Sequence, residues 1–142
     1  MSWRRRTAPD RGRLFDVVGS REPLYSSAVG RVLLAFQPPE WRRLYLQRTK
    51  LESLTPKTIA SKRELERLLA SVRRERMAIS HEETIEGATG IAAPVLDKAG
   101  DILAGLVIRV PTSRTLSRME EPQHRVGAAA VEISRLMGYA DA

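Results

Sequence analysis

The chain of 142 residues has no cysteine, and only two histidines and seven aromatic residues. The lack of cysteine excludes thiol catalysis, cysteine-ligated zinc and a disulfide framework, and it fits a reducing compartment. The scattered aromatic residues provide no stacking platform for single-stranded nucleic acid. No apolar run exceeds the length of a strand, so we expect no signal peptide, no membrane span and a cytoplasmic location.

Recognisable catalytic and metal-binding patterns are also lacking. There is no Gly-x-Ser-x-Gly nucleophile elbow, and no helix-turn-helix pair is recognisable. His81 and Glu83 share one face of a predicted strand, but zinc needs three or four ligands and His124 lies in a distant predicted helix. The turn EGATG at 86–90 lacks the lysine and following helix of a phosphate loop, which favours a plain β-turn. We therefore expect no enzyme activity, no metal and no cofactor.

Positive charge is abundant and unevenly placed. The formal net charge is +7, and five arginines fall within the first thirteen residues against a single aspartate. Such a balance suggests nucleic acid as a partner, but a short like-charged run is more often a solvated, disordered end. We predict a disordered basic arm over residues 1–13, one ordered domain over 14–138 and a short tail at 139–142.

Four helices are predicted from apolar periodicity and capping residues. Ser26 or Ser27 can cap the first, with an apolar stripe of Ala28, Val29, Val32, Leu33 and Phe36, and 37-QPP-39 ends it. The second follows Pro39, and the third opens at the capping box 61-SKRE-64. The last has Pro122 in its first turn and an apolar stripe that runs to Leu136 and Met137 before Gly138.

Strands are predicted where the period changes. A short strand is predicted at 14-LFDVV-18, and further strands at MAIS, HEETIEG, GIAAPVL and DILAGLVIRV after residue 76. The turn 97-DKAG-100 makes the last two strands an antiparallel hairpin, with glycine where a positive φ is common. The fold class is therefore α+β, with helices packed on an antiparallel sheet.

The last strand carries Arg109 within an apolar run. Strand alternation places Gly105, Val107 and Arg109 on one face, together with Gly90 and Ala92 of the neighbouring strand. Small residues on one face of a sheet leave a hollow. Two interpretations remain open: a helix packs into the hollow, or the hollow is a small-molecule cleft whose cation is Arg109.

The order of several segments resembles a known family. The segments are 23-PLYSSAVGRVLLA-35, 54-LTPKTI-59, 82-EETIEGATGIAAPVLDKAGDILAGLVI-108, 111-PTSR-114 and the final helix AVEISRLMG. Together they closely resemble the effector-binding domain of IclR-type bacterial transcription regulators, over residues 14–138. The resemblance implies a GAF-like or profilin-like fold, a small organic acid or aromatic metabolite as effector, and assembly into homodimers or tetramers.

The resemblance also implies a ligand-binding set. Its positions in this chain are Ala28, Val29, Ser80, Gly90, Val107 and Arg109. Family members often carry an acid, a thiol or hydroxyls at the latter positions, whereas this chain offers a single cation. We therefore predict an anionic ligand, with Arg109 pairing bidentately with a carboxylate.

A further departure concerns the segments that precede the match. In the family a winged helix-turn-helix, a linker helix and the first strands of the domain come earlier, and this chain begins too late to contain them. DNA contact is thus expected only through an absent domain, and an incomplete sheet would expose an edge that favours a homodimer. The chain is expected to be a ligand sensor or, alternatively, a ligand-free interaction module or truncated remnant.

Overall fold

The computed structural model describes residues 21–115 and 117–140. The elements follow the chain as α1 (Ala28–Ala35), α2 (Pro39–Arg48), α3 (Lys62–Glu75), β1 (Ala78–His81), β2 (Ala88–Leu96), β3 (Ile102–Pro111), α4 (Thr112–Thr115) and α5 (Glu120–Leu136). The predicted basic arm 1–13 and the predicted strand 14–18 lie outside the described residues. No helix in the described ranges is long and apolar enough to cross a membrane.

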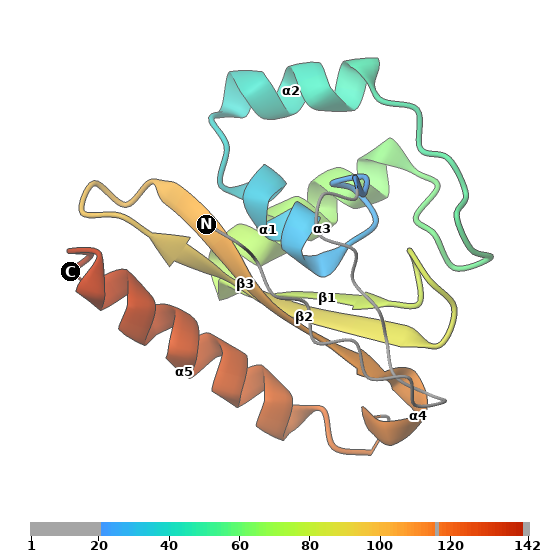
Figure 1. The fold of residues 1–142 in the computed structure, drawn as a ribbon. Helices are drawn as coiled ribbons and strands as arrows, with labels where there is room; N and C mark the ends of the chain where they lie inside the picture. The colour runs from blue at the N-terminus through green and yellow to red at the C-terminus, as the bar shows by residue number, and fades with distance from the viewer. Residues whose placement is uncertain (1–20, 116, 141–142) are drawn as a thin grey trace.

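The predicted α+β class is confirmed. The described strands form an antiparallel three-stranded sheet in the order β1-β2-β3. Helices α1 and α3 lie over one face of this sheet and α5 lies along the other, while α2 lies beyond α1 (Figure 1). Each face has its own apolar cluster, because β2 alternates between Ala92 on the α1 side and Ile91 with Ala93 on the α5 side.

The predicted hairpin of β2 and β3 is confirmed, together with its register. Gly90 pairs with Arg109 and Ala92 pairs with Val107, so the small residues share the face of Arg109 as alternation predicted. The turn between the strands has Gly100 at φ 83°. In this left-handed region a side chain would be strained, which explains the glycine.

The helix starts follow their capping residues. The Ser27 hydroxyl accepts a hydrogen bond from the Gly30 amide at 3.0 Å, and the Ser61 hydroxyl accepts one from the Glu64 amide at 3.2 Å. In α3 the side chains of Leu65, Leu69 and Val72 are buried, and Leu68 is partly buried against the same apolar cluster. Caps of this kind stabilise a helix by about 1 kcal/mol each.

Two stripes were predicted incompletely. In α1 the buried set is wider than one stripe and includes Arg31 and Leu34, because the helix packs against both the sheet and α3. In α5 the predicted core positions Leu136 and Met137 are wrong, since these side chains are 77% and 50% exposed. Ser134 is buried there instead and donates to Ala130 O while accepting from the Leu96 amide.

The predicted strand HEETIEG is also wrong beyond its first residue. Strand β1 ends at His81, and residues 82–87 form a turn that leads back into β2. Glu82 has φ 54° and Gly87 has φ 82°, so neither residue continues an extended strand. The backbone carbonyls of Glu82 and Glu83 accept hydrogen bonds from the 54–59 segment, which holds this turn off the sheet.

Candidate effector-binding site

One cavity lies where the start of α1 meets the three strands. Its lining includes all six residues of the predicted ligand-binding set, and the structure thus brings residues from positions 28 to 109 together. The lining is completed by Ser27, Thr84, Ile85 and Ala88. The 82–87 turn therefore contributes to the cavity wall, although the sequence pattern assigned it to a strand.

The predicted hollow is partly filled by α1. A Cβ atom at Gly105 would lie 2.6 Å from Cγ2 of Val29, so the helix packs into that part of the sheet face. A Cβ atom at Gly90 would lie 3.2 Å from Cβ of Ala28. The helix-packing interpretation thus holds at Gly105, and the open space remains beside Gly90, Val107 and Arg109.

The remaining space is small. The volume open to water in this cavity is about 20 Å³, which is close to the volume that one water molecule needs. Sites for drug-sized molecules usually occupy at least about 300 Å³. An organic ligand therefore requires side chains of the wall to move apart.

Hydroxyl groups on the wall are engaged in hydrogen bonds with the segment before α1. The Ser80 hydroxyl donates to the carbonyl of Ser26 at 2.6 Å, and the Thr84 hydroxyl donates to the Ser26 hydroxyl at 3.0 Å. In the described residues no buried side-chain nitrogen or oxygen is left without a partner. The polar wall is therefore internally satisfied.

Arg109, the predicted ligand cation, is paired with a carboxylate of the same chain. Its Nη2 lies 3.0 Å from Oε2 and 3.3 Å from Oε1 of Glu22, and the two side chains are only 15% and 28% exposed. The Arg109 guanidinium thus donates hydrogen bonds to a carboxylate beside the cavity.

The amino-terminal end of α1 adds to the positive potential. Ser27 caps the helix, and Ala28 with Val29 forms its first turn at the cavity wall. The first amides of a helix lack intrahelical acceptors, and the helix dipole places partial positive charge there. Together with Arg109 this end gives the cavity wall a positive electrostatic potential.

The 82–87 turn is held by a buried ion pair that sequence analysis missed. Arg31 Nη2 lies 2.6 Å from Oε1 of Glu83, and Arg31 Nε donates to the carbonyl of Tyr25 at 2.8 Å. The Arg31 side chain is only 3% exposed. A charged residue inside the apolar helix 28-AVGRVLLA-35 was the available signal, since such a charge needs a partner when buried.

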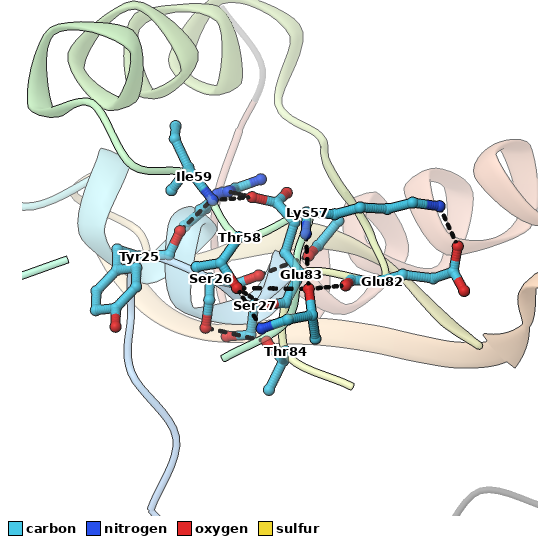
Figure 2. Close-up of polar contacts among 12 residues, drawn as sticks. Tyr25, Ser26, Ser27, Lys57, Thr58, Ile59, Glu82, Glu83 and Thr84 are labelled. Carbon is cyan, nitrogen blue, oxygen red and sulfur yellow. Dashed lines mark hydrogen bonds and ion pairs between the residues drawn. The ribbon is translucent and has the colours of Figure 1, made fainter. Parts of the chain in front are cut away.

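The 54–59 segment completes this attachment. The Thr58 hydroxyl donates to the carbonyl of Glu83 at 2.6 Å, and the Ile59 amide donates to the Glu83 carboxylate at 3.0 Å. Figure 2 shows Glu83 between the 57–59 segment and the serines that precede α1. These contacts connect the cavity wall to the start of α1 and to the loop before α3.

Glu82 forms the outer part of the same turn. Its carboxylate accepts from Lys57 Nζ and from the Gly87 amide, each at 2.6 Å. The hydrogen bond from Lys57, followed by that from the Gly87 amide, lowers the pKa of Glu82 below its ordinary value. The charged carboxylate thus bridges the two ends of the 82–87 turn.

His81 and Glu83, the pair considered for a metal site, both lie in the described ranges. No group of three or more His, Cys, Asp or Glu residues there could hold a metal ion. His81 and Glu83 do not form a shared site, because the Glu83 carboxylate binds Arg31.

Comparison with known proteins identifies the family. The model of the bacterial transcriptional regulator IclR C-terminal domain matches residues 5–135. The HTH-type transcriptional regulator KdgR of Escherichia coli is 38% identical over 130 residues, which cover 91% of this chain and 49% of KdgR. KipR of Bacillus subtilis is 30% identical over 128 residues, covering 89% of this chain and 51% of KipR. The chain thus spans about half the length of these relatives.

Solved structures agree with this assignment. The crystal structure of the C-terminal domain of E. coli KdgR matches with a TM-score of 0.77 and 38% identity, over 85% of this chain and 74% of that one. A double mutant of the PobR inducer-binding domain from Acinetobacter, in complex with 3-hydroxybenzoic acid, matches with a TM-score of 0.76 and 28% identity, over 83% and 69% of the two chains. The relatives are transcription regulators and not enzymes. The chain belongs to the IclR family of bacterial transcription regulators and corresponds to their C-terminal, effector-binding domain.

Proposed function

We propose that this domain senses a small organic acid in the cavity at the start of α1, with Arg109 binding the carboxylate of the effector. The observation that carries the proposal is the contact between Arg109 and the Glu22 carboxylate on the wall of that cavity. The first turn of α1 supports an anionic ligand from a second direction. The solved complex of the PobR inducer-binding domain with 3-hydroxybenzoic acid also supports the proposal, since that similar domain holds an aromatic acid.

Binding in this proposal exchanges one carboxylate for another. The effector displaces Glu22 from Arg109, and the wall opens from its present water-sized space. The 82–87 turn contributes Thr84 and Ile85 to that wall, and Ile85 is 41% exposed. If the cavity wall opens at this turn, the contacts of the turn with the 54–59 segment and α1 change. Effector binding would then alter the structure beyond the cavity itself.

The regulatory output is also a proposal. We propose that the domain assembles as a homodimer or tetramer in the cytoplasm and that a separate DNA-binding domain contacts DNA. Effector binding then changes DNA occupancy through the arrangement of subunits, because a ligand shifts an equilibrium only as far as it binds the two states differently.

The test is calorimetric titration of the domain with a panel of small carboxylates, including 3-hydroxybenzoate. We expect at least one to bind, and Arg109→Ala to weaken it at least tenfold, since a hydrogen bond to a charged group contributes about 1.5–3 kcal/mol. Arg114→Ala is the matched control, because Arg114 is exposed on α4 and the charge change is identical. Equal affinity of Arg109→Ala and wild type would contradict the proposal.

The water-sized cavity and the paired Arg109 also suit a domain that acts without a ligand. In that second function the module supports assembly only, and no carboxylate in the panel changes its thermal stability. An effector present at a hundred times its Kd should instead stabilise the domain by about 2.7 kcal/mol. The thermal shift therefore separates the two functions.

A further inference from the structure

A second cavity lies between α2 and α3, outside the proposed effector site. Leu46 is the buried residue of α2, and the helix stands beyond α1 on the outside of the fold (Figure 1). The volume open to water between the two helices is about 290 Å³, which is more than ten times the volume of the cavity at the start of α1. Its lining has three arginines, Arg42, Arg43 and Arg73, the apolar Leu46 and Leu69, and the acidic Glu66.

Arg42 is fixed in place at this cavity, which we call the α2–α3 cleft. Its Nη1 donates to the carbonyl of Ala35 at 3.0 Å and to that of Gln37 at 3.1 Å, so the side chain caps the end of α1. Because the anchoring uses one of its nitrogens, the guanidinium is oriented before any ligand arrives. This pre-organisation reduces the entropy that a ligand would have to overcome.

Arg73 of α3 brings a second cation to the same cleft. Burial, followed by repulsion from Arg73, lowers the pKa of Arg42 below its ordinary value. Within the described ranges no ion pair joins Glu66 to either arginine, and Arg43 uses Glu40 at 2.6 Å on the solvent side. Two cations of the same sign thus line one cleft, and a bound anion would reduce their repulsion.

The segment that surrounds the cleft also carries most of the net positive charge of the chain. Residues 39–76 carry eleven Lys or Arg residues and five Glu, a net charge of +6 out of +7 for the whole chain. A field of this sign raises the local concentration of anions at the cleft.

The number of cations indicates the class of anion. One carboxylate balances one guanidinium, whereas a phosphate monoester carries a charge of about −1.5 to −2 at neutral pH and three acceptor oxygens. Guanidinium groups match phosphate oxygens with two parallel hydrogen bonds. Leu46 and Leu69 offer an apolar surface for the organic part of such a molecule.

We propose that the α2–α3 cleft is a binding site for a small organic phosphate, held through its phosphate group by Arg42 and Arg73. The domain would then have two anion sites of different preference, a carboxylate site at Arg109 and a phosphate site between α2 and α3. The second site does not depend on the first, because the two share no lining residue.

The test uses phenyl phosphate and, as its matched carboxylate, benzoate, titrated into the 142-residue chain at about 0.15 M ionic strength, where weak surface attraction is screened. Wild type should bind phenyl phosphate with a Kd below about 1 mM, roughly −4 kcal/mol. Arg73→Gln should weaken this at least tenfold. Arg74→Gln, the same charge change on an exposed neighbour outside the cleft, should change it less than twofold.

Three outcomes would overturn the proposal: no binding of phenyl phosphate by wild type, equal losses in Arg73→Gln and Arg74→Gln, or loss of phenyl phosphate binding in Arg109→Ala. The last would place the phosphate in the effector cavity. Failure of benzoate alone bears on the proposed effector site and not on the cleft. Arg73 is exposed, so its substitution should leave the unfolding midpoint unchanged, and denaturation of each variant checks this.

Discussion

The cavity at the start of α1 and the cleft between α2 and α3 both present arginine, in opposite states. At the first, Arg109 is paired with Glu22 and about 20 Å³ is open to water-sized spheres. At the second, Arg42 and Arg73 both line an open space of about 290 Å³. A ligand at the first must displace a carboxylate and open a wall, whereas a ligand at the second enters existing space. The first arrangement suits a switch and the second a site that is always available.

The largest expected effect concerns the ion pair that holds the 82–87 turn, which lines the first cavity. Arg31→Ala leaves the Glu83 carboxylate buried without its cation, so we expect a loss of about 3–5 kcal/mol in the free energy of unfolding. Urea denaturation measures it. Arg43→Ala, which breaks the exposed pair with Glu40, is the control and should cost less than about 1 kcal/mol. Similar losses in both variants would show that burial does not distinguish the two regions.

A smaller effect is expected from the carboxylate that competes with the effector. Glu22→Gln removes the charge that Arg109 now binds, so the affinity for a carboxylate effector should rise about twofold to fivefold, as for a partly exposed ion pair worth under about 1 kcal/mol. Calorimetry measures the change. Glu86→Gln, the same change on an exposed residue of the 82–87 turn, should have no effect. Weaker binding after Glu22→Gln would instead make Glu22 part of the effector contact.

The smallest effect is a pH dependence at the outer end of the 82–87 turn. The pKa of Glu82 is lowered in the folded state, first by the hydrogen bond from Lys57. Its contribution to stability is therefore fully present above the pKa of the unfolded chain and is lost as pH falls through the lower pKa of the folded state. Wild type should therefore exceed Glu82→Gln in stability at neutral pH, and the difference should shrink in acid. Denaturation midpoints of both at several pH values measure this. If the stability difference between wild type and Glu82→Gln increased in acid, the pKa of Glu82 would be raised and not lowered by folding.

The sequence was sufficient to predict the hairpin and the caps because these depend on short-range rules. Alternation placed Gly90, Val107 and Arg109 on one face, and the register of β2 and β3 confirms it. Position before apolar periodicity predicts Ser26 or Ser27 as one cap and Ser61 as another, and the structure shows that Ser27 and Ser61 are the caps. The six residues proposed for the ligand required the family resemblance as well. No local sequence pattern indicates that the segments of Ala28 and Ser80 lie close together in the fold.

Features set by contacts distant in sequence were missed. The 82–87 turn looked like a strand because its partners, Thr55 and Thr58, lie in a loop about 25 residues earlier. The pairing of Arg109 with Glu22 spans 87 residues, and neither residue reveals it alone. The α2–α3 cleft was missed because its arginines belong to helices with ordinary alternating charge, and only the position of α2 brings Arg42 and Arg73 to one space.

The proposed function depends most of all on the binding of an organic acid at Arg109. Amide chemical-shift mapping of the isotope-labelled domain tests it directly, using an effector carboxylate identified by calorimetry. We expect the carboxylate to shift the amide signals of Val29, Gly90 and Arg109 and to leave those of Arg42 and Arg73 unchanged. Phenyl phosphate should give the opposite pattern. Shifts from the carboxylate confined to the α2–α3 cleft, with none around Gly90 and Arg109, would contradict it.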